Sequence, residues 1–142
     1  MCSDLPRARM TATPFLAATG LTADYLPLLR ERDFGDILGT PYSELDGDLY
    51  DESYEPVNGE TATQFRTRVH RAWHRIRRSH RTSSESILVI THGHFCRVSA
   101  EEVLTIDGEP SRPSAFANAS LTIAASSPPH PVELHNCTVH LG

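Results

Sequence analysis

Apolar positions recur with helical spacing in one long segment, from about residue 61 to residue 78. Phe65, Val69, Trp73 and Ile76 follow one another at intervals of four, four and three, which places them on one stripe of a helix. Arginines occupy much of the remaining surface. We therefore predict an amphipathic helix over Thr61–Arg78, with its stripe against the core and its arginines on a solvated face.

Start and stop residues indicate a helix near the N-terminus. Pro6 suits the first turn of a helix, and Ser3 or Asp4 is available as its cap. Pro14 is expected to end or kink this helix, and Gly20 is a later terminator. In the longer helix, Thr61 and Gln64 have the spacing of a capping box.

Short aliphatic runs predict strands between these helices. Ile87–Ile90 is a continuous run, typical of a strand covered on both faces, and the chain then turns at Gly93 into a helix predicted from Phe95 to about Leu104. The other predicted strands are Leu26–Leu29, Leu121–Ala124, Val132–Leu134 and a short segment with Val139 and Leu141. Helices that alternate with such strands predict an α/β sandwich.

Composition limits the class of protein. The 142 residues fit a single domain over residues 1–142, and 13 basic against 18 acidic residues give a net charge of −5. This balance argues against general binding of nucleic acid or of an acidic membrane surface. Three scattered cysteines, an odd number, favour free thiols in a reducing compartment. We expect a cytoplasmic protein with neither nucleic-acid nor membrane partners.

The segment 39–59 shows no regular period. It is rich in glycine, proline, tyrosine and acidic residues, and loops of this length within one domain are usually functional or disordered. We interpret it as a surface lid loop, with a disordered insertion as the alternative.

Two polar residues stand where phosphate binding would be expected. His92 follows the strand predicted at Ile87–Ile90, where open α/β sheets bind their ligands, and Gly93 permits close approach to the next helix N-terminus. The alternative is a histidine that only caps that helix. At the start of the N-terminal helix, either Arg7 or Arg9 could hold an anion, because a guanidinium and free backbone N–H groups can act together there.

Histidine pairs also raise a metal-binding interpretation. His92 and His94 form a His-x-His pair, and His70 and His74 are one helical turn apart. Neither pair has a third ligand nearby in the sequence, so we expect no metal site. A metal-dependent hydrolase that uses His92 and His94 remains the least favoured interpretation.

Five short motifs occur in an order that resembles the histidine phosphatase superfamily, also called the phosphoglycerate-mutase-like family. Ser3 with Arg7-Ala8 matches its Ser-x-x-x-Arg-Ala pattern, and Leu29, Glu31, Phe34 and Gly35 match Leu-x-Glu-x-x-Phe-Gly. The remaining three are the strand followed by His92-Gly93, Asn58-Gly59-Glu60-Thr61 and Asn118-Ala119-Ser120. The resemblance extends from Ser3 almost to the C-terminus.

The resemblance implies both a fold and a chemistry. The fold is a three-layer α/β/α sandwich, and the activity is phosphomonoester hydrolysis or transfer through a phosphohistidine, with no cofactor. His92 would stabilise charge and Glu31 would transfer protons as the catalytic acid. The residues implied around the substrate are Arg7, Gly93, His94 and Glu60. The expected ligand is phosphate or a small phosphorylated metabolite.

The family's Arg-His-Gly motif, whose histidine is the nucleophile, does not occur in this chain. The chain begins where the family's second strand ends, so we expect an N-terminally incomplete fold. One interpretation is a truncated phosphatase that is inactive as it stands. The other is a non-catalytic phosphate-binding or interaction protein, a pseudo-phosphatase, that has kept Arg7 and His92. Phosphatases and mutases share the motifs above, and the acidic segment 39–59 favours the phosphatase branch.

Overall fold

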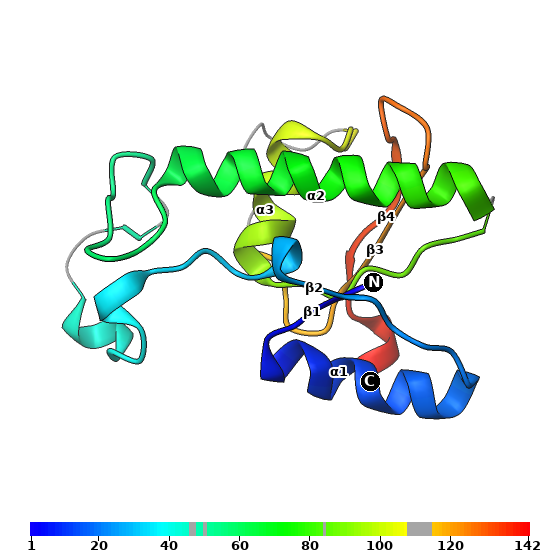
Figure 1. Cartoon of the computed structure of the whole chain (residues 1–142), viewed down its shortest axis with the longest axis horizontal. Coiled ribbons are helices and arrows are strands. Elements are labelled where there is room, and N and C mark those ends of the chain that lie inside the picture. Colours follow the sequence, from blue (N-terminus) through cyan, green and yellow to red (C-terminus); the bar gives the residue numbers. More distant parts are fainter. Residues whose placement is uncertain (46–47, 50, 84, 108–114) are drawn as a thin grey trace.

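Three α-helices and two two-stranded sheets make up the described part of a computed structural model, which covers residues 1–45, 48–49, 51–83, 85–107 and 115–142. The helices are α1 (Pro6–Thr19), α2 (Ala62–Ser83) and α3 (Gly93–Glu102), and the strands are β1 (Cys2–Ser3), β2 (Tyr25–Leu26), β3 (Leu121–Ala124) and β4 (Val132–Cys137) (Figure 1). Short 3₁₀ turns cover Pro27–Leu29, Gly35–Ile37, Tyr42–Glu44 and Val139–Leu141.

α2 is the helix that the apolar stripe predicts, and it continues to Ser83. Its start is a capping box: the Thr61 N–H donates to Gln64 Oε1 (2.9 Å), and the Gln64 N–H donates to Thr61 Oγ1 (3.2 Å). Phe65, Val69 and Ile76 are buried in the main core, as predicted, while Trp73 packs at its edge. The apolar stripe and the capping box together explain why this helix can be predicted from the sequence.

α1 begins at Pro6, but its cap differs from the prediction. Leu5 is the N-cap residue and makes no side-chain cap bond, because Ser3 and Asp4 serve other partners. Ser3 Oγ lies 2.8 Å from His92 Nε2, and the Asp4 carboxylate accepts two hydrogen bonds from Arg30 (2.7 and 2.6 Å). The side chains that were expected to cap α1 instead connect it to other segments.

The end of α1 confirms one expectation and corrects another. The helix is not ended by Pro14, because that position and the Met10 side chain one turn earlier are exposed, so water can bind the Met10 carbonyl that loses its partner. Gly20 terminates the helix in the left-handed conformation, with φ 70° and its N–H bonded to Leu16 O at 2.9 Å.

β1 lies between β2 and the segment around Ile90. It pairs in parallel with β2, and Cys2 forms a parallel bridge with Ile90. The Ile90 N–H donates to Met1 O (3.0 Å), and the Ser3 N–H donates to Ile90 O (2.9 Å). The predicted strand Ile87–Ile90 is therefore wrong in extent, since only Ile90 forms a bridge. It is also not covered on both faces, because Leu88 is 40% exposed.

Side chains around β1 alternate between two helices. Cys2 and Ile90 pack with Ala8 and Ala12 of α1, whereas Met1, Ile87 and Val89 pack against the core cluster that includes α2. Figure 1 shows the consequence, with α2 and α1 on opposite sides of the short strands. The two-residue period of extended chain thus explains why one helix covers each face.

Two other strand predictions need correction. In Leu26–Leu29, only Leu26 belongs to a strand, and Pro27–Leu29 is a 3₁₀ turn because Pro27 has no N–H for a ladder. Val139–Leu141 is also a 3₁₀ turn. The predicted strands at Leu121–Ala124 and Val132–Leu134 are confirmed, and they form an antiparallel pair in which β4 continues to Cys137.

The mixed helix and strand content agrees with the predicted α/β class. The described strands form two separate sheets, so the three-layer sandwich remains a prediction. Of the predicted lid loop, residues 46, 47 and 50 lie outside the described residues. Its remaining part is tied to the body by buried Arg32, which donates to the carbonyls of Leu49 (3.3 Å), Tyr54 (2.7 Å) and Glu60 (2.9 Å).

Candidate functional site

The structure brings together two residues that lie 85 positions apart in the chain, Arg7 and His92. Arg7 Nε donates to His92 Nδ1 at 3.1 Å. Arg7 belongs to the first turn of α1, and His92 is the extended residue that immediately precedes α3. The two residues expected at an anion site are therefore in direct contact, beside the N-terminus of α3.

The contact with Arg7 also assigns the proton on His92. A guanidinium has only donors, so Nδ1 must accept, and a neutral imidazole then carries its proton on Nε2. Nε2 lies 2.8 Å from Ser3 Oγ, which is fully buried and also accepts from the Leu5 N–H at 3.3 Å. Ser3 thus holds the His92 ring in one orientation.

His92 is neutral at physiological pH. Burial lowers the pKa of His92 to about 4, and the positive charges of Arg7 and Arg68 lower it further. The side chain is 8% exposed. A buried neutral imidazole between two arginines is an environment that an anion would stabilise, because an anion offsets both positive charges.

Glu31 occupies the N-terminus of α3. Its Oε2 accepts the His94 backbone N–H (3.1 Å), and its Oε1 accepts the Arg32 N–H (3.1 Å). Burial raises the pKa of Glu31, while those backbone bonds and the charge of Arg7 oppose the rise. The helix terminus, which attracts negative charge, therefore already holds the side chain of the predicted acid.

A cavity of about 430 Å³ lies beside Glu31 and is also lined by Glu60. Glu60 is held by Arg68, whose Nε and Nη2 lie 2.8 and 2.6 Å from its two carboxylate oxygens. The same guanidinium donates to the carbonyls of Leu28 (3.1 Å), Arg30 (2.8 Å) and Glu31 (3.1 Å). Arg68 thereby fixes both carboxylate-bearing segments at one wall of the cavity.

The glycine of the Leu-x-Glu-x-x-Phe-Gly pattern makes this arrangement possible. Gly35 has φ 57°, and a Cβ there would collide with the backbone of Val57, Asn58 and Gly59. Its neighbour Asp36 donates its N–H to Val57 O at 3.1 Å. The close approach of these two segments places Glu60 near Glu31.

A family model for the histidine phosphatase superfamily (branch 1) matches residues 1–137. This chain belongs to the histidine phosphatase superfamily. Comparison with curated proteins finds no match. The matched range includes the segments that carry Arg7, Glu31 and His92, so the residues that meet around α3 are those that resemble the superfamily's motifs.

In this histidine phosphatase superfamily member, the predicted binding residues His94 and Gly93 differ in their surroundings. The His94 ring is 8% exposed and packs against Phe65 and Phe34, with ring centroids 4.7 and 6.2 Å apart. Burial lowers its pKa to about 4, and the charge of Arg32 contributes. His94 does not line the cavity beside Glu31. In contrast, the space around Gly93 is open, since a Cβ there would meet no atom within 4 Å.

Arg68 and Arg32 organise the site, and the motif search missed both. Arg68 lies three residues after Phe65 and one before Val69, so it borders the buried stripe of α2 rather than the solvated face. That position is the signal that could have identified it. Arg32 is 3% exposed, and only its contacts with segment 49–60 reveal its role, because nothing local distinguishes it from its charged neighbours.

The described residues contain neither a cluster of metal-ligating side chains nor a helix that could span a membrane. Among the described residues, no group of three or more His, Cys, Asp and Glu side chains could hold a metal ion. His70 instead pairs with Glu102, with Nε2 and Oε2 2.6 Å apart. Within the same residues, no helix combines the length and apolar character needed to cross a bilayer.

Proposed function

We propose that this phosphatase-like protein binds the phosphoryl group of a phosphomonoester beside Arg7 and His92. The observation that carries the proposal is the 3.1 Å hydrogen bond between Arg7 Nε and His92 Nδ1. It leaves the two terminal nitrogens of Arg7 without a hydrogen bond among the described residues. A guanidinium presents such paired donors in the geometry that phosphoryl oxygens require.

Binding of the anion changes the charge state of His92 in this proposal. The pKa of His92 is lowered to about 4 by burial and by two arginines, and a bound dianion acts in the opposite direction. Phosphate binding therefore favours protonation of the imidazole at Nδ1. Because a protonated Nδ1 can no longer accept from Arg7, both side chains would then donate to the phosphate instead. A protonated His92 stabilises negative charge on the transferred group, which is the role that the family resemblance implies.

Glu31 is proposed as the proton-transfer residue. Burial raises the pKa of Glu31, and a raised pKa helps a carboxyl group to act as a general acid. The lining of the adjacent cavity of about 430 Å³ includes the polar side chains of Arg30, Asn58 and Gln64. Such a lining suits the polar alcohol portion of a small phosphorylated metabolite. Gly93 and Glu60 complete the proposed surroundings of the substrate, while the buried His94 ring supports the site from the core side.

Turnover requires a nucleophile that the known motifs of this chain do not provide. Because the sequence has no Arg-His-Gly, we propose that the 142-residue chain binds phosphate but does not hydrolyse phosphomonoesters by itself. The same observation favours a non-catalytic phosphate-binding protein as the second candidate function. An Arg-His-Gly motif in the coding frame upstream of Met1 would favour the truncated phosphatase.

Three finer proposals accompany this function. The positions of α1 and α2 on opposite faces of β1 support the family's three-layer α/β/α sandwich. The contacts of Arg32 with the carbonyls of Leu49 and Tyr54 support a role for segment 39–59 as a cover near the site. The three free cysteines support a reducing compartment, such as the cytoplasm.

The test is a titration with inorganic phosphate and with vanadate, followed by amide NMR shifts. We expect shifts centred on Arg7, His92 and Gly93, with at least about tenfold weaker binding in Arg7→Ala. Arg9→Ala is the matched control, because Arg9 is on the same helix but bonds Asp4 O (3.0 Å) and stacks over Tyr25. Equal affinity in wild type and Arg7→Ala would refute the assignment of Arg7.

A parallel assay with an aryl phosphate tests the catalytic part of the proposal. We expect no turnover above that of a mock purification. Turnover that is lost in His92→Ala would show that another residue has replaced the nucleophile, and the non-catalytic interpretation would then be wrong.

A further inference from the structure

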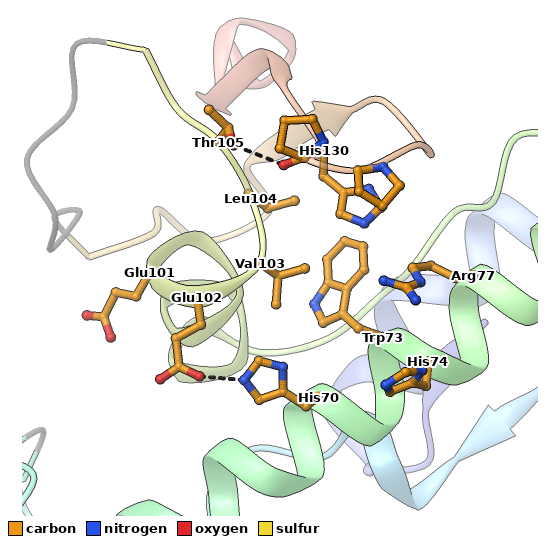
Figure 2. A pocket seen from close by; sticks show the side chains of 12 residues that line it. His70, Trp73, His74, Arg77, Glu101, Glu102, Val103, Leu104, Thr105 and His130 are labelled. Atoms are coloured by element: carbon orange, nitrogen blue, oxygen red, sulfur yellow. Dashed lines mark hydrogen bonds and ion pairs between the residues drawn. The ribbon is translucent and has the colours of Figure 1, made fainter.

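Another cavity of about 430 Å³ lies at the opposite end of α3, between α2, the residues that follow α3 and the β3–β4 loop (Figure 2). It shares no lining residue with the cavity beside Glu31. At 1.5 Å per residue, the ten-residue α3 separates this end from His92 by about 15 Å. The volume falls within the range of small-molecule sites, so the cavity is a separate candidate binding site.

The centre of this cavity is a fixed aromatic side chain, Trp73. Its Nε1–H donates to Ser99 Oγ (2.9 Å), which in turn donates to Phe95 O (2.8 Å). The His130 ring lies 5.5 Å from the indole at an interplanar angle of 40°. Figure 2 shows the indole amid the lining side chains, and Pro128 and Pro129 add apolar wall. A rigid aromatic wall of this kind favours a planar ring as ligand.

The cavity has one lining arginine, Arg77, that forms no ion pair within the described residues. Glu102 pairs with Arg66 and His70, and Glu101 pairs with Arg66 (3.3 Å) and Arg97 (3.0 Å). In contrast, Arg77 and His74 form no ion pair within the described residues, and both are exposed at the cavity. α2 carries seven arginines and no acidic residue. Both acidic lining residues contact arginines outside the lining, and Arg66 also pairs with Glu52 (2.9 Å). Arg77 is therefore the lining arginine that is available to an anion.

A buried ring nitrogen adds a further polar requirement. His130 is 3% exposed, and its Nδ1 lies 3.0 Å from Ala125 O. A carbonyl only accepts, so Nδ1 carries the proton of the neutral ring and Nε2 carries the lone pair. Nε2 has no hydrogen-bond partner among the described residues. An unmet buried acceptor is unfavourable, but Nε2 is closed to a water molecule. A ligand N–H or O–H group would therefore reach it only if the His130 side chain turned toward the cavity.

We propose that this cavity binds a small aromatic anion. Its planar ring packs against Trp73, and its anionic group lies on Arg77 and His74. The site is independent of phosphoryl binding beside Arg7, because the two share no residue.

Fluorescence of Trp73 provides the test, since it is the single tryptophan of the chain. Benzenesulfonate serves as the probe, because it combines a ring with an anionic group and cannot be hydrolysed as a phosphomonoester. We expect a saturable change in Trp73 emission. Methanesulfonate, which lacks the ring, and benzyl alcohol, which lacks the charge, should each bind at least about tenfold more weakly.

Variants of two neighbouring arginines distinguish a specific binding site from general attraction to the positive charge of α2. Arg77→Gln should weaken benzenesulfonate binding about tenfold, whereas Arg78→Gln should leave it unchanged, because Arg78 is exposed on α2 but does not line the cavity. Circular dichroism verifies that both exposed-site variants fold. Arg7→Ala should also leave binding unchanged, which keeps this result separate from the proposed phosphate site.

Three outcomes would overturn the proposal. The first is no saturable change in emission with benzenesulfonate. The second is equal binding of methanesulfonate, which would mean that Trp73 contributes no ring contact. The third is an equal loss in Arg77→Gln and Arg78→Gln, which would reduce the effect to the overall positive charge of α2.

Discussion

Arg68 forms a bidentate ion pair with Glu60, with N–O distances of 2.8 and 2.6 Å. The same guanidinium donates hydrogen bonds to three backbone carbonyls between Leu28 and Glu31. Arg68 of α2 therefore connects the segment that carries Glu31, the proposed acid, with Glu60, which lies just before α2. Both side chains of the pair are largely buried, with 18% and 16% exposure.

Arg68→Ala should lower the free energy of unfolding by about 3 kcal/mol, because it leaves a largely buried carboxylate and three carbonyls without their donor. Urea unfolding measures the effect. Arg71→Ala is the matched control on an exposed position of the same helix, and a change within about 0.5 kcal/mol is expected there. Similar losses in both variants would show that the Arg68 network contributes no specific stability.

Gly35→Ala should destabilise the protein by about 2 kcal/mol or more, because the position has φ 57° and an added Cβ would collide with backbone atoms of residues 57–59. Gly39→Ala is the control for conformation alone, since Gly39 has φ 92° but nothing within 4 Å of its Cβ position. The two thermal transitions should differ clearly. Equal transitions would mean that the close approach of the two segments is not required.

Stability should fall as the pH decreases from 6.5 to 4. Burial lowers the pKa values of His92 and His94 from 6.5 to about 4, so the unfolded chain binds more protons in this range and acid favours unfolding. Both contributions are fully present above pH 6.5 and lost below pH 4. The raised pKa of Glu31 acts oppositely, because its unfavourable ionisation begins near pH 4.5. The net fall in stability is therefore smaller than the loss from the two histidines alone.

The loss expected is on the order of 3 kcal/mol for each of these two histidines. Denaturant unfolding at a series of pH values measures it, and histidine NMR shifts report each ring separately. The pH dependence should weaken in His92→Gln and His94→Gln. A stability that is flat between pH 6.5 and 4, with both rings titrating near 6.5, would contradict the buried neutral state.

Glu31→Gln should strengthen sulfate binding beside Arg7 and His92, by about threefold to tenfold at neutral pH. The reason is that the Glu31 carboxylate accepts the His94 N–H at the N-terminus of α3 and competes electrostatically with an incoming anion. Calorimetry or NMR titration measures the change. Sulfate is suitable because its charge is constant over this pH range. Weaker sulfate binding in the variant would show that Glu31 does not compete with the anion.

The local pattern of residues was sufficient to predict α2, the end of α1 and the strands β3 and β4. The capping bonds of Thr61 and Gln64, the stripe from Phe65 to Ile76 and the left-handed Gly20 all involve neighbours within about one helical turn. Such interactions are encoded in residue spacing. The same pattern placed Arg7 at a helix start and His92 immediately before another helix, and it indicated the superfamily.

Tertiary structure decided which segments meet. Nothing in the run Ile87–Ile90 indicates that only Ile90 pairs with Cys2, and nothing near His94 indicates that its ring packs on Phe34 and Phe65. These contacts join residues distant in the chain, so they depend on how helices pack and which backbone donors remain unmatched.

The sequence by itself determined the superfamily, the class of fold and the residue types available for binding an anion. Only the folded chain decided that Arg7 donates to His92, that Glu31 caps α3 and that Arg68 holds Glu60. The physical reason is the range of the interactions. Helix stripes and caps act over three or four residues, whereas a charged hydrogen bond across 85 positions exists only after burial has brought both partners together.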